Sequence, residues 1–131
     1  MNREALLDML RSRVPDLLAV YAFGSHTQGT AGPQSDLDLA VLVAGYVEPL
    51  ALWALSGDLA EVAGCPVDLL DLRAASTVMQ HQIITTGQRR WARDSQAVLY
   101  EAAILSEKTA LDTARAGLLE DIYKRGSVYG R

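Results

Sequence analysis

The stretch GSHTQGTAGPQSDLD, residues 24–38, decides the fold of this chain. An apolar run precedes it, LLAVYAF at residues 17–23, and a second run, LAVLV at residues 39–43, follows it. Runs of this length and composition are typical of buried β-strands. The Gly-rich segment between them has room for one or two helical turns at most. The sequence therefore predicts two sheet strands joined by a polar loop.

Two aspartates, Asp36 and Asp38, begin the second of these strands. Side chains two positions apart on a strand point to the same side, so the two carboxylates are expected to project together. Carboxylates held side by side repel each other, and a hard divalent cation relieves that repulsion. The pair therefore predicts a metal site, with Mg²⁺ as the expected ion.

The other end of the stretch predicts a phosphate-binding turn. Gly24 follows the first strand and lets the backbone turn and approach a ligand closely. Ser25 is a good helix N-cap and offers a hydroxyl group, and the backbone amides after it can hold a phosphate.

A third carboxylate is expected from the run PVDLLDL, residues 66–72, which predicts a third strand. Asp68 and Asp71 compete for this role, and because they are three positions apart they face opposite sides of the strand. Asp68 lies within the apolar run, where an acid is costly to bury unless it has a partner such as a metal. Asp71 lies at the exit of the strand and can equally cap a turn with Arg73.

Periodicity and capping residues predict the remaining elements. Helices are expected at residues 2–14, 49–63 and 76–86, an edge strand at 88–92, and a long last helix at about 95–124 that begins at Asp94 or Ser95. These elements predict an α/β (α+β) fold, a small mixed β-sheet flanked by helices. The 131 residues fit one domain, 1–131, with no internal repeat or linker.

Composition excludes several classes of protein. The net charge is −4, whereas nonspecific binding to nucleic acid needs a basic surface. The single cysteine, Cys65, permits no intrachain disulfide and fits a reducing cytoplasm. No apolar run approaches the length of a membrane span, and the first ten residues lack the hydrophobic region of a signal peptide. We therefore expect a cytoplasmic enzyme without a membrane partner.

The stretch AFGSHTQGTAGPQSDLDLAVL, residues 22–42, resembles the signature of the DNA polymerase β-like nucleotidyltransferases. The short chain further resembles the minimal nucleotidyltransferases, which are antitoxin partners of HEPN-type toxins. The resemblance implies a polymerase β palm-like fold and Mg²⁺-dependent transfer from ATP. It implies Asp36, Asp38 and Asp68 as metal ligands and catalytic acids, and Gly24 and Ser25 as contacts of the β and γ phosphates.

The sequence departs from the pattern of this family at two positions. Many relatives carry arginines just after the Gly-Ser pair, where this chain has His26 and Gln28. Elsewhere in the chain, Arg73, Arg89 and Arg90 are candidates for balancing the triphosphate charge, with an exposed structural role as the alternative. His81 falls in a predicted helix, where a surface or packing role is the more common one.

The resemblance implies that the chain transfers AMP to a tyrosine of a cognate HEPN ribonuclease toxin and so silences it. The last predicted helix favours such a protein partner because it is long and amphipathic. Its apolar positions are Val98, Ala102, Leu105, Leu111, Leu118 and Ile122. An ordinary packing helix is the alternative explanation. Two other functions stay open, adenylylation of a small molecule of the aminoglycoside type and a non-catalytic antitoxin that acts by binding alone.

Overall fold

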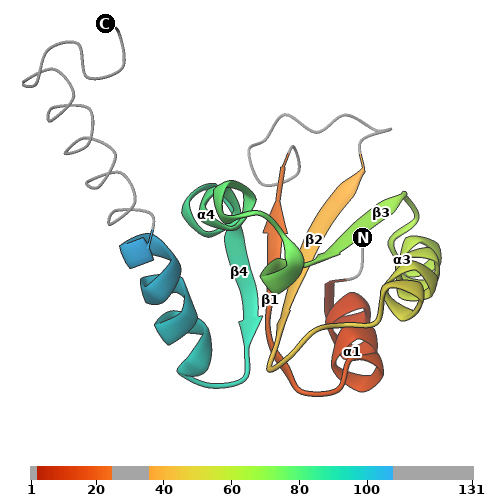
Figure 1. Ribbon diagram of the computed structural model, residues 1–131. Coiled ribbons are helices and arrows are strands. Elements are labelled where there is room, and N and C mark those ends of the chain that lie inside the picture. The colour runs from red at the N-terminus through yellow and green to blue at the C-terminus, as the bar shows by residue number, and fades with distance from the viewer. Residues whose placement is uncertain (1–2, 25–35, 108–131) are drawn as a thin grey trace, which may run out of the picture.

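The computed structural model describes residues 3–24 and 36–107, which form a mixed β-sheet with helices on both faces (Figure 1). The strands are β1 (Leu17–Phe23), β2 (Leu37–Val43), β3 (Val67–Asp71) and β4 (Gln88–Ala92). Their order in the sheet is β3-β2-β1-β4. β1 runs antiparallel to β2 and β4, whereas β2 and β3 are parallel. The predicted mixed sheet is confirmed, as is the edge position of residues 88–92.

The parallel pair β2 and β3 requires a crossover, and α3 (Pro49–Ala63) supplies it. The side chain of Glu48 caps the helix by accepting a hydrogen bond of 2.8 Å from the Ala51 amide. Pro49 occupies the first turn, where its missing amide hydrogen costs nothing. The helix ends at Gly64, whose φ of 75° is left-handed.

The two faces of the sheet belong to separate hydrophobic clusters. The face that we call the α1 face packs on α1 (Arg3–Arg13) and α3, and it includes Leu37, Leu39 and Val41 of β2. The opposite face, called the α4 face, includes Ala40 and Leu42. Side chains of β2 therefore alternate between the two clusters, as strand geometry requires.

Three elements cover the α4 face: η1 (Leu72–Ala74), α4 (Thr77–Thr86) and a helix that the structure describes at residues 96–107. Ser76 caps α4 by accepting a hydrogen bond of 3.1 Å from the Met79 amide, as predicted. The last helix starts with a hydrogen bond of 2.9 Å from the Gln96 amide to Asp94. Its predicted continuation to about residue 124 lies outside the described residues. Within the described ranges, no helix is long and apolar enough to cross a bilayer.

Candidate active site

The three predicted acids lie at one end of the β2–β3 pair. Asp36 immediately precedes β2, and Asp38 is the second residue of that strand. Asp68 is the second residue of β3 and is the register partner of Asp38. Register partners on parallel strands share a face, as do residues two apart on one strand. The backbone therefore directs all three carboxylates toward the α4 face.

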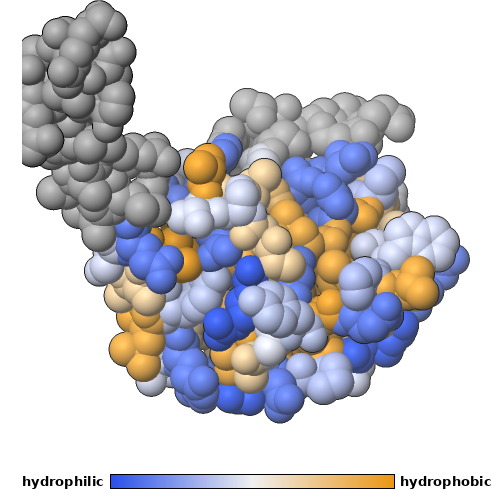
Figure 2. Space-filling view, in the orientation of Figure 1, coloured by the Kyte–Doolittle hydropathy of each residue, from blue (hydrophilic) through white to orange (hydrophobic). Residues whose placement is uncertain are grey.

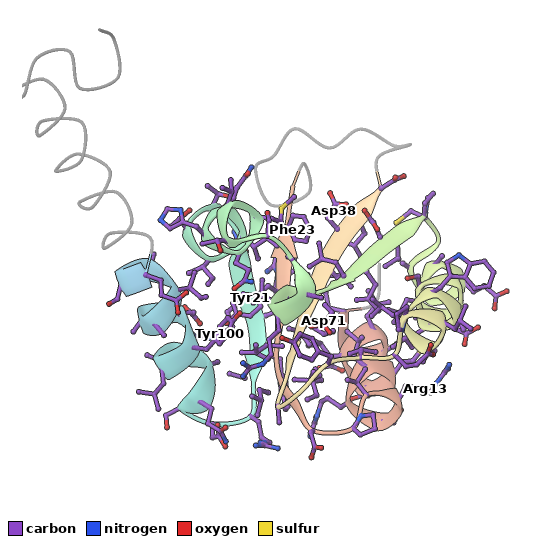
Figure 3. All side chains as sticks on the ribbon, in the orientation of Figure 1. Arg13, Tyr21, Phe23, Asp38, Asp71 and Tyr100 are labelled. Carbon is purple, nitrogen blue, oxygen red and sulfur yellow. The ribbon has the colours of Figure 1, made fainter. Side chains whose placement is uncertain are left out.

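The three acids are accessible to solvent to different degrees. Asp36 and Asp68 are exposed, and Asp38 is half-buried. Phe23, at the end of β1, pairs with Asp38 across the antiparallel ladder and is half-buried on the same face. Figure 3 shows Phe23 and Asp38 together at this end of the sheet. The site is thus open to a ligand on one side and bordered by an aromatic ring on the other.

Gly24 lies directly beside the Asp38 side chain. Its φ is 79°, a left-handed conformation that side chains disfavour, and a Cβ built on it would overlap the Asp38 carboxylate. Gly24 is therefore required here for two reasons, its backbone conformation and the close approach of Asp38. Ser25, His26 and Gln28 lie outside the described residues, so the predicted phosphate contact of Ser25 stays a prediction.

The donor set fits Mg²⁺ by its chemistry, because hard carboxylate oxygens are the ligands that this ion prefers. In residues 3–24 and 36–107, however, no three His, Cys, Asp or Glu side chains converge closely enough to hold a metal. Mg²⁺ is usually held by one or two carboxylates together with substrate phosphates and water, rather than by a cage of protein ligands. A site that closes only around the metal–nucleotide complex is consistent with this arrangement.

Asp71, the competing third acid, has a different place and different partners. Its side chain is only 5% exposed and accepts hydrogen bonds from the amides of Val47, at 2.8 Å, and Arg73, at 3.1 Å. It pairs with Val41, three residues along the ladder from the Asp38–Asp68 pair. Asp71 thus holds the loop after β2 and caps η1, and the structure brings Asp68, not Asp71, beside Asp38.

The arginines proposed to balance phosphate charge are engaged elsewhere. Arg73 donates from Nε to the Val43 carbonyl oxygen at 2.6 Å, and its guanidinium lies 4.8 Å from the ring centroid of Tyr100. Arg89 forms an ion pair with Glu101 at 2.5 Å, and the hydrogen bond within that pair raises the Arg89 pKa.

Arg90, like Arg89, borders a cavity of about 440 Å³ beneath α1. Burial and the nearby charge of Arg3 lower its pKa. His81 lies within α4, as predicted.

The glycine turn and the carboxylates on one face of a mixed sheet are the parts that a nucleotide-transferring site needs. Comparison of the sequence with known protein families points to the same kind of site. Residues 4–96 match the family described as Polymerase beta, Nucleotidyltransferase. The chain belongs to this family.

Two relatives show how this nucleotidyltransferase compares with known proteins. It is 35% identical to Protein adenylyltransferase MntA of Shewanella oneidensis over 122 residues, which are 93% of this chain and 88% of that protein. It is 38% identical to an Aminoglycoside (3'') (9) adenylyltransferase of Klebsiella pneumoniae over 71 residues, which are 53% of this chain and 27% of that protein.

Two solved structures of toxin–antitoxin complexes confirm the nucleotidyltransferase fold. A toxin–antitoxin with AMP-PNP contains a chain that matches with a TM-score of 0.81 and 35% identity, covering 94% of this chain and 99% of that chain. The structure of the tri-AMPylated Shewanella oneidensis HEPN toxin in complex with MNT antitoxin also contains a chain that matches. Its TM-score is 0.72 and its identity 32%, and the match covers 92% of this chain and 94% of that chain.

The structure places the three predicted acids and Gly24 at one end of the sheet, where their roles stay predictions, and it adds a neighbour that was not predicted, Phe23. The signal was available, because Tyr21 and Phe23 alternate with Val20 and Ala22 in the first strand. Without the antiparallel register, however, the residue opposite Asp38 could not be identified.

Proposed function

We propose that this nucleotidyltransferase transfers AMP from ATP to a tyrosine hydroxyl of a HEPN-type ribonuclease toxin and thereby neutralises it. The observation that carries the proposal is the register pairing of Asp38 with Asp68, with Gly24 packed against the Asp38 carboxylate. The match to Protein adenylyltransferase MntA along 93% of the chain supports a protein acceptor. We place the reaction in the cytoplasm, which supplies ATP.

In the proposed reaction, Asp36 and Asp38 hold Mg²⁺, and Asp68 is the third ligand or accepts the proton of the acceptor hydroxyl. Bound Mg²⁺ would supply positive charge that stabilises the phosphate oxygens as the reaction proceeds. The tyrosine oxygen forms a bond to the α-phosphorus of ATP, the bond from the α-phosphorus to the bridging oxygen breaks, and pyrophosphate leaves. The residues contribute mainly by positioning the reactants and by electrostatic stabilisation.

Gly24 and Ser25 are proposed to hold the β and γ phosphates. Gly24 has a left-handed backbone conformation and lies beside the Asp38 carboxylate, which supports a phosphate position next to the proposed metal ligands. With His26 and Gln28 in the positions where many relatives have arginine, backbone amides and Mg²⁺ carry more of the triphosphate charge in this proposal.

The two alternative functions have less support. The aminoglycoside adenylyltransferase matches this chain over only 27% of its own length, so most of that protein has no counterpart here. A non-catalytic antitoxin would have no use for carboxylates gathered on one face of the sheet, because like charges side by side are unfavourable unless they bind something.

Labelled ATP, Mg²⁺ and a HEPN-type toxin, for which a product of the adjacent gene is the first candidate, provide the test. We expect label on the toxin with the wild-type protein and a loss of at least about a hundredfold with Asp36→Asn, which removes a metal ligand. Asp58→Asn is the matched control, because Asp58 is an exposed aspartate that pairs with Arg13 away from the site. Full activity of Asp36→Asn, or equal losses in both variants, would refute the assignment.

A further inference from the structure

The helices over the α4 face form one continuous layer. The Tyr100 hydroxyl, on the last helix, donates a hydrogen bond of 2.6 Å to Gln80 of α4. Ile83 of α4 and Ala97 of the last helix are both fully buried in the same cluster. The two helices therefore pack side by side, and their outer sides form a common surface.

This surface carries almost no charge. α4 has the sequence TVMQHQIITT, without Asp, Glu, Lys or Arg. Between residues 96 and 106, the one charged residue is Glu101, and it turns inward. Its carboxylate accepts a hydrogen bond of 2.8 Å from the buried Tyr21 hydroxyl and pairs with Arg89. Glu107, the last described residue of this helix, is exposed, so the uncharged stretch ends at residue 106. Within that stretch the single acid points toward the sheet, the reverse of an ordinary surface helix.

Large apolar side chains take the outward positions instead. The exposed fractions are 67% for Val78, 51% for Val98 and 67% for Leu99, and Met79 and Leu105 are also exposed. Figure 2 shows hydrophobic surface at the outer edge of the last helix and above α4. The sheet side of the last helix is formed by Ala97 and Ile104. The predicted position Val98 therefore faces outward, away from the sheet.

The surface borders the candidate active site. A Cβ built on Gly87, at the end of α4, would lie 2.8 Å from the Ala22 carbonyl oxygen and 3.2 Å from the Phe23 Cβ. The end of α4 thus packs against the end of β1, where Phe23 pairs with Asp38. A macromolecule that docks on these helices lies on the same face of the sheet as the acids.

We propose that the outward side of α4 and residues 96–106, here called the two-helix surface, docks the protein acceptor through an uncharged, apolar face of that acceptor. The inference rests on the proposed function and adds where the toxin binds. Depletion of charge with exposed apolar side chains is typical of the centre of a protein interface. A second copy of this chain fits less well, because each copy has a net charge of −4 and a cluster of acids at the edge of this surface.

The test places a charge on the surface and compares it with a matched charge elsewhere. Leu99→Glu introduces a carboxylate into the two-helix surface, and Leu50→Glu introduces the same group at a position on α3 that is 72% exposed. We expect Leu99→Glu to raise the KM for the toxin at least about tenfold, with kcat at saturating toxin and the KM for ATP unchanged. Leu50→Glu should behave as the wild type, and equal melting temperatures would show that both variants fold.

Calorimetric titration of the toxin into each protein without ATP separates this inference from the proposed function. If the wild type binds the toxin but transfers no AMP, the proposed function fails, and weaker binding by Leu99→Glu still supports the docking surface. Equal binding by Leu99→Glu and the wild type overturns the inference, as does an equal loss with Leu50→Glu. A homodimer that Leu99→Glu dissociates would put a second copy on this surface and would also overturn it.

Discussion

Substitution of Gly24 by alanine tests the geometry of the site at its tightest point. The φ of 79° places residue 24 in the left-handed region, which costs an alanine about 1–2 kcal/mol. The new methyl group would also overlap the Asp38 carboxylate, so Asp38 must leave its position. Displacement of that side chain from a favoured rotamer adds about 1 kcal/mol.

The two effects together predict that Gly24→Ala lowers the free energy of unfolding by about 2–3 kcal/mol. For a domain of this size, such a loss corresponds to a decrease in melting temperature of roughly 6–15 °C. Displacement of a proposed metal ligand by about 1 Å should lower kcat on the order of a hundredfold. The part of the stability loss that exceeds the conformational cost and the catalytic loss come from the same contact, so they should appear together.

Gly64→Ala is the matched control. Gly64 has nearly the same φ, 75°, but a Cβ built there meets nothing within 4 Å. This variant should therefore show the conformational cost alone, about 1–2 kcal/mol, with full transfer of AMP. Thermal melting followed by circular dichroism and transfer of labelled AMP give the two quantities. If Gly24→Ala matches Gly64→Ala in both measurements, the contact with Asp38 has no role and the reasoning is wrong.

Three further predictions separate catalysis from stability. Asp71→Ala should lose about 2–4 kcal/mol of stability because it leaves two partly buried amides, those of Val47 and Arg73, without an acceptor. Asp68→Ala should instead lose AMP transfer with a stability change of about 0.5 kcal/mol or less. Thermal melts and the transfer assay would reveal the opposite pattern if the roles were reversed. Burial and the hydrogen bond to Glu101 raise the pKa of Tyr21 above its ordinary value of 10.0, so this contribution to stability is present below pH 10 and is lost as the pH rises above it. Tyr21→Phe should be less stable by about 1 kcal/mol near neutral pH and should show a smaller loss above pH 10 in denaturant titrations; an unchanged pH profile would contradict this. Chelation of Mg²⁺ by EDTA should abolish transfer but leave the melting temperature of the nucleotide-free protein unchanged, and a large decrease would instead indicate a structural metal.

Most of the secondary structure could be predicted from local sequence signals. The run Leu17–Phe23 is β1 as predicted, and the predicted helix 49–63 is α3, because apolar periodicity, Pro49 and Gly64 all indicate the same element. The strand predicted at 66–72 is shorter, Val67–Asp71, because Asp71 accepts the Arg73 amide and starts η1 at Leu72. Local hydrogen-bond chemistry of this kind is hard to infer from composition.

The sequence could predict the part of the site that lies on one strand but not the part that depends on how strands pair. Asp36 and Asp38 share one strand, so spacing alone places them on one face. The position of Asp68 beside Asp38 depends on the register between β2 and β3, which packing of the whole crossover sets. The inward turn of Glu101 likewise depends on a residue 80 positions away, Tyr21, so periodicity of the last helix could not show which of its sides meets the sheet.

The parallel register also constrains how this chain can change in evolution. The carbonyl of Pro66 accepts a hydrogen bond of 2.9 Å from the Leu37 amide and so fixes where β3 starts relative to β2. Insertion or deletion of one residue between Val43 and Val67 would shift β3 by one position unless the loops absorbed it, and Asp68 would then face α1 and α3. Substitutions in α3 can accumulate, but its length is expected to be inherited unchanged wherever the third acid is retained.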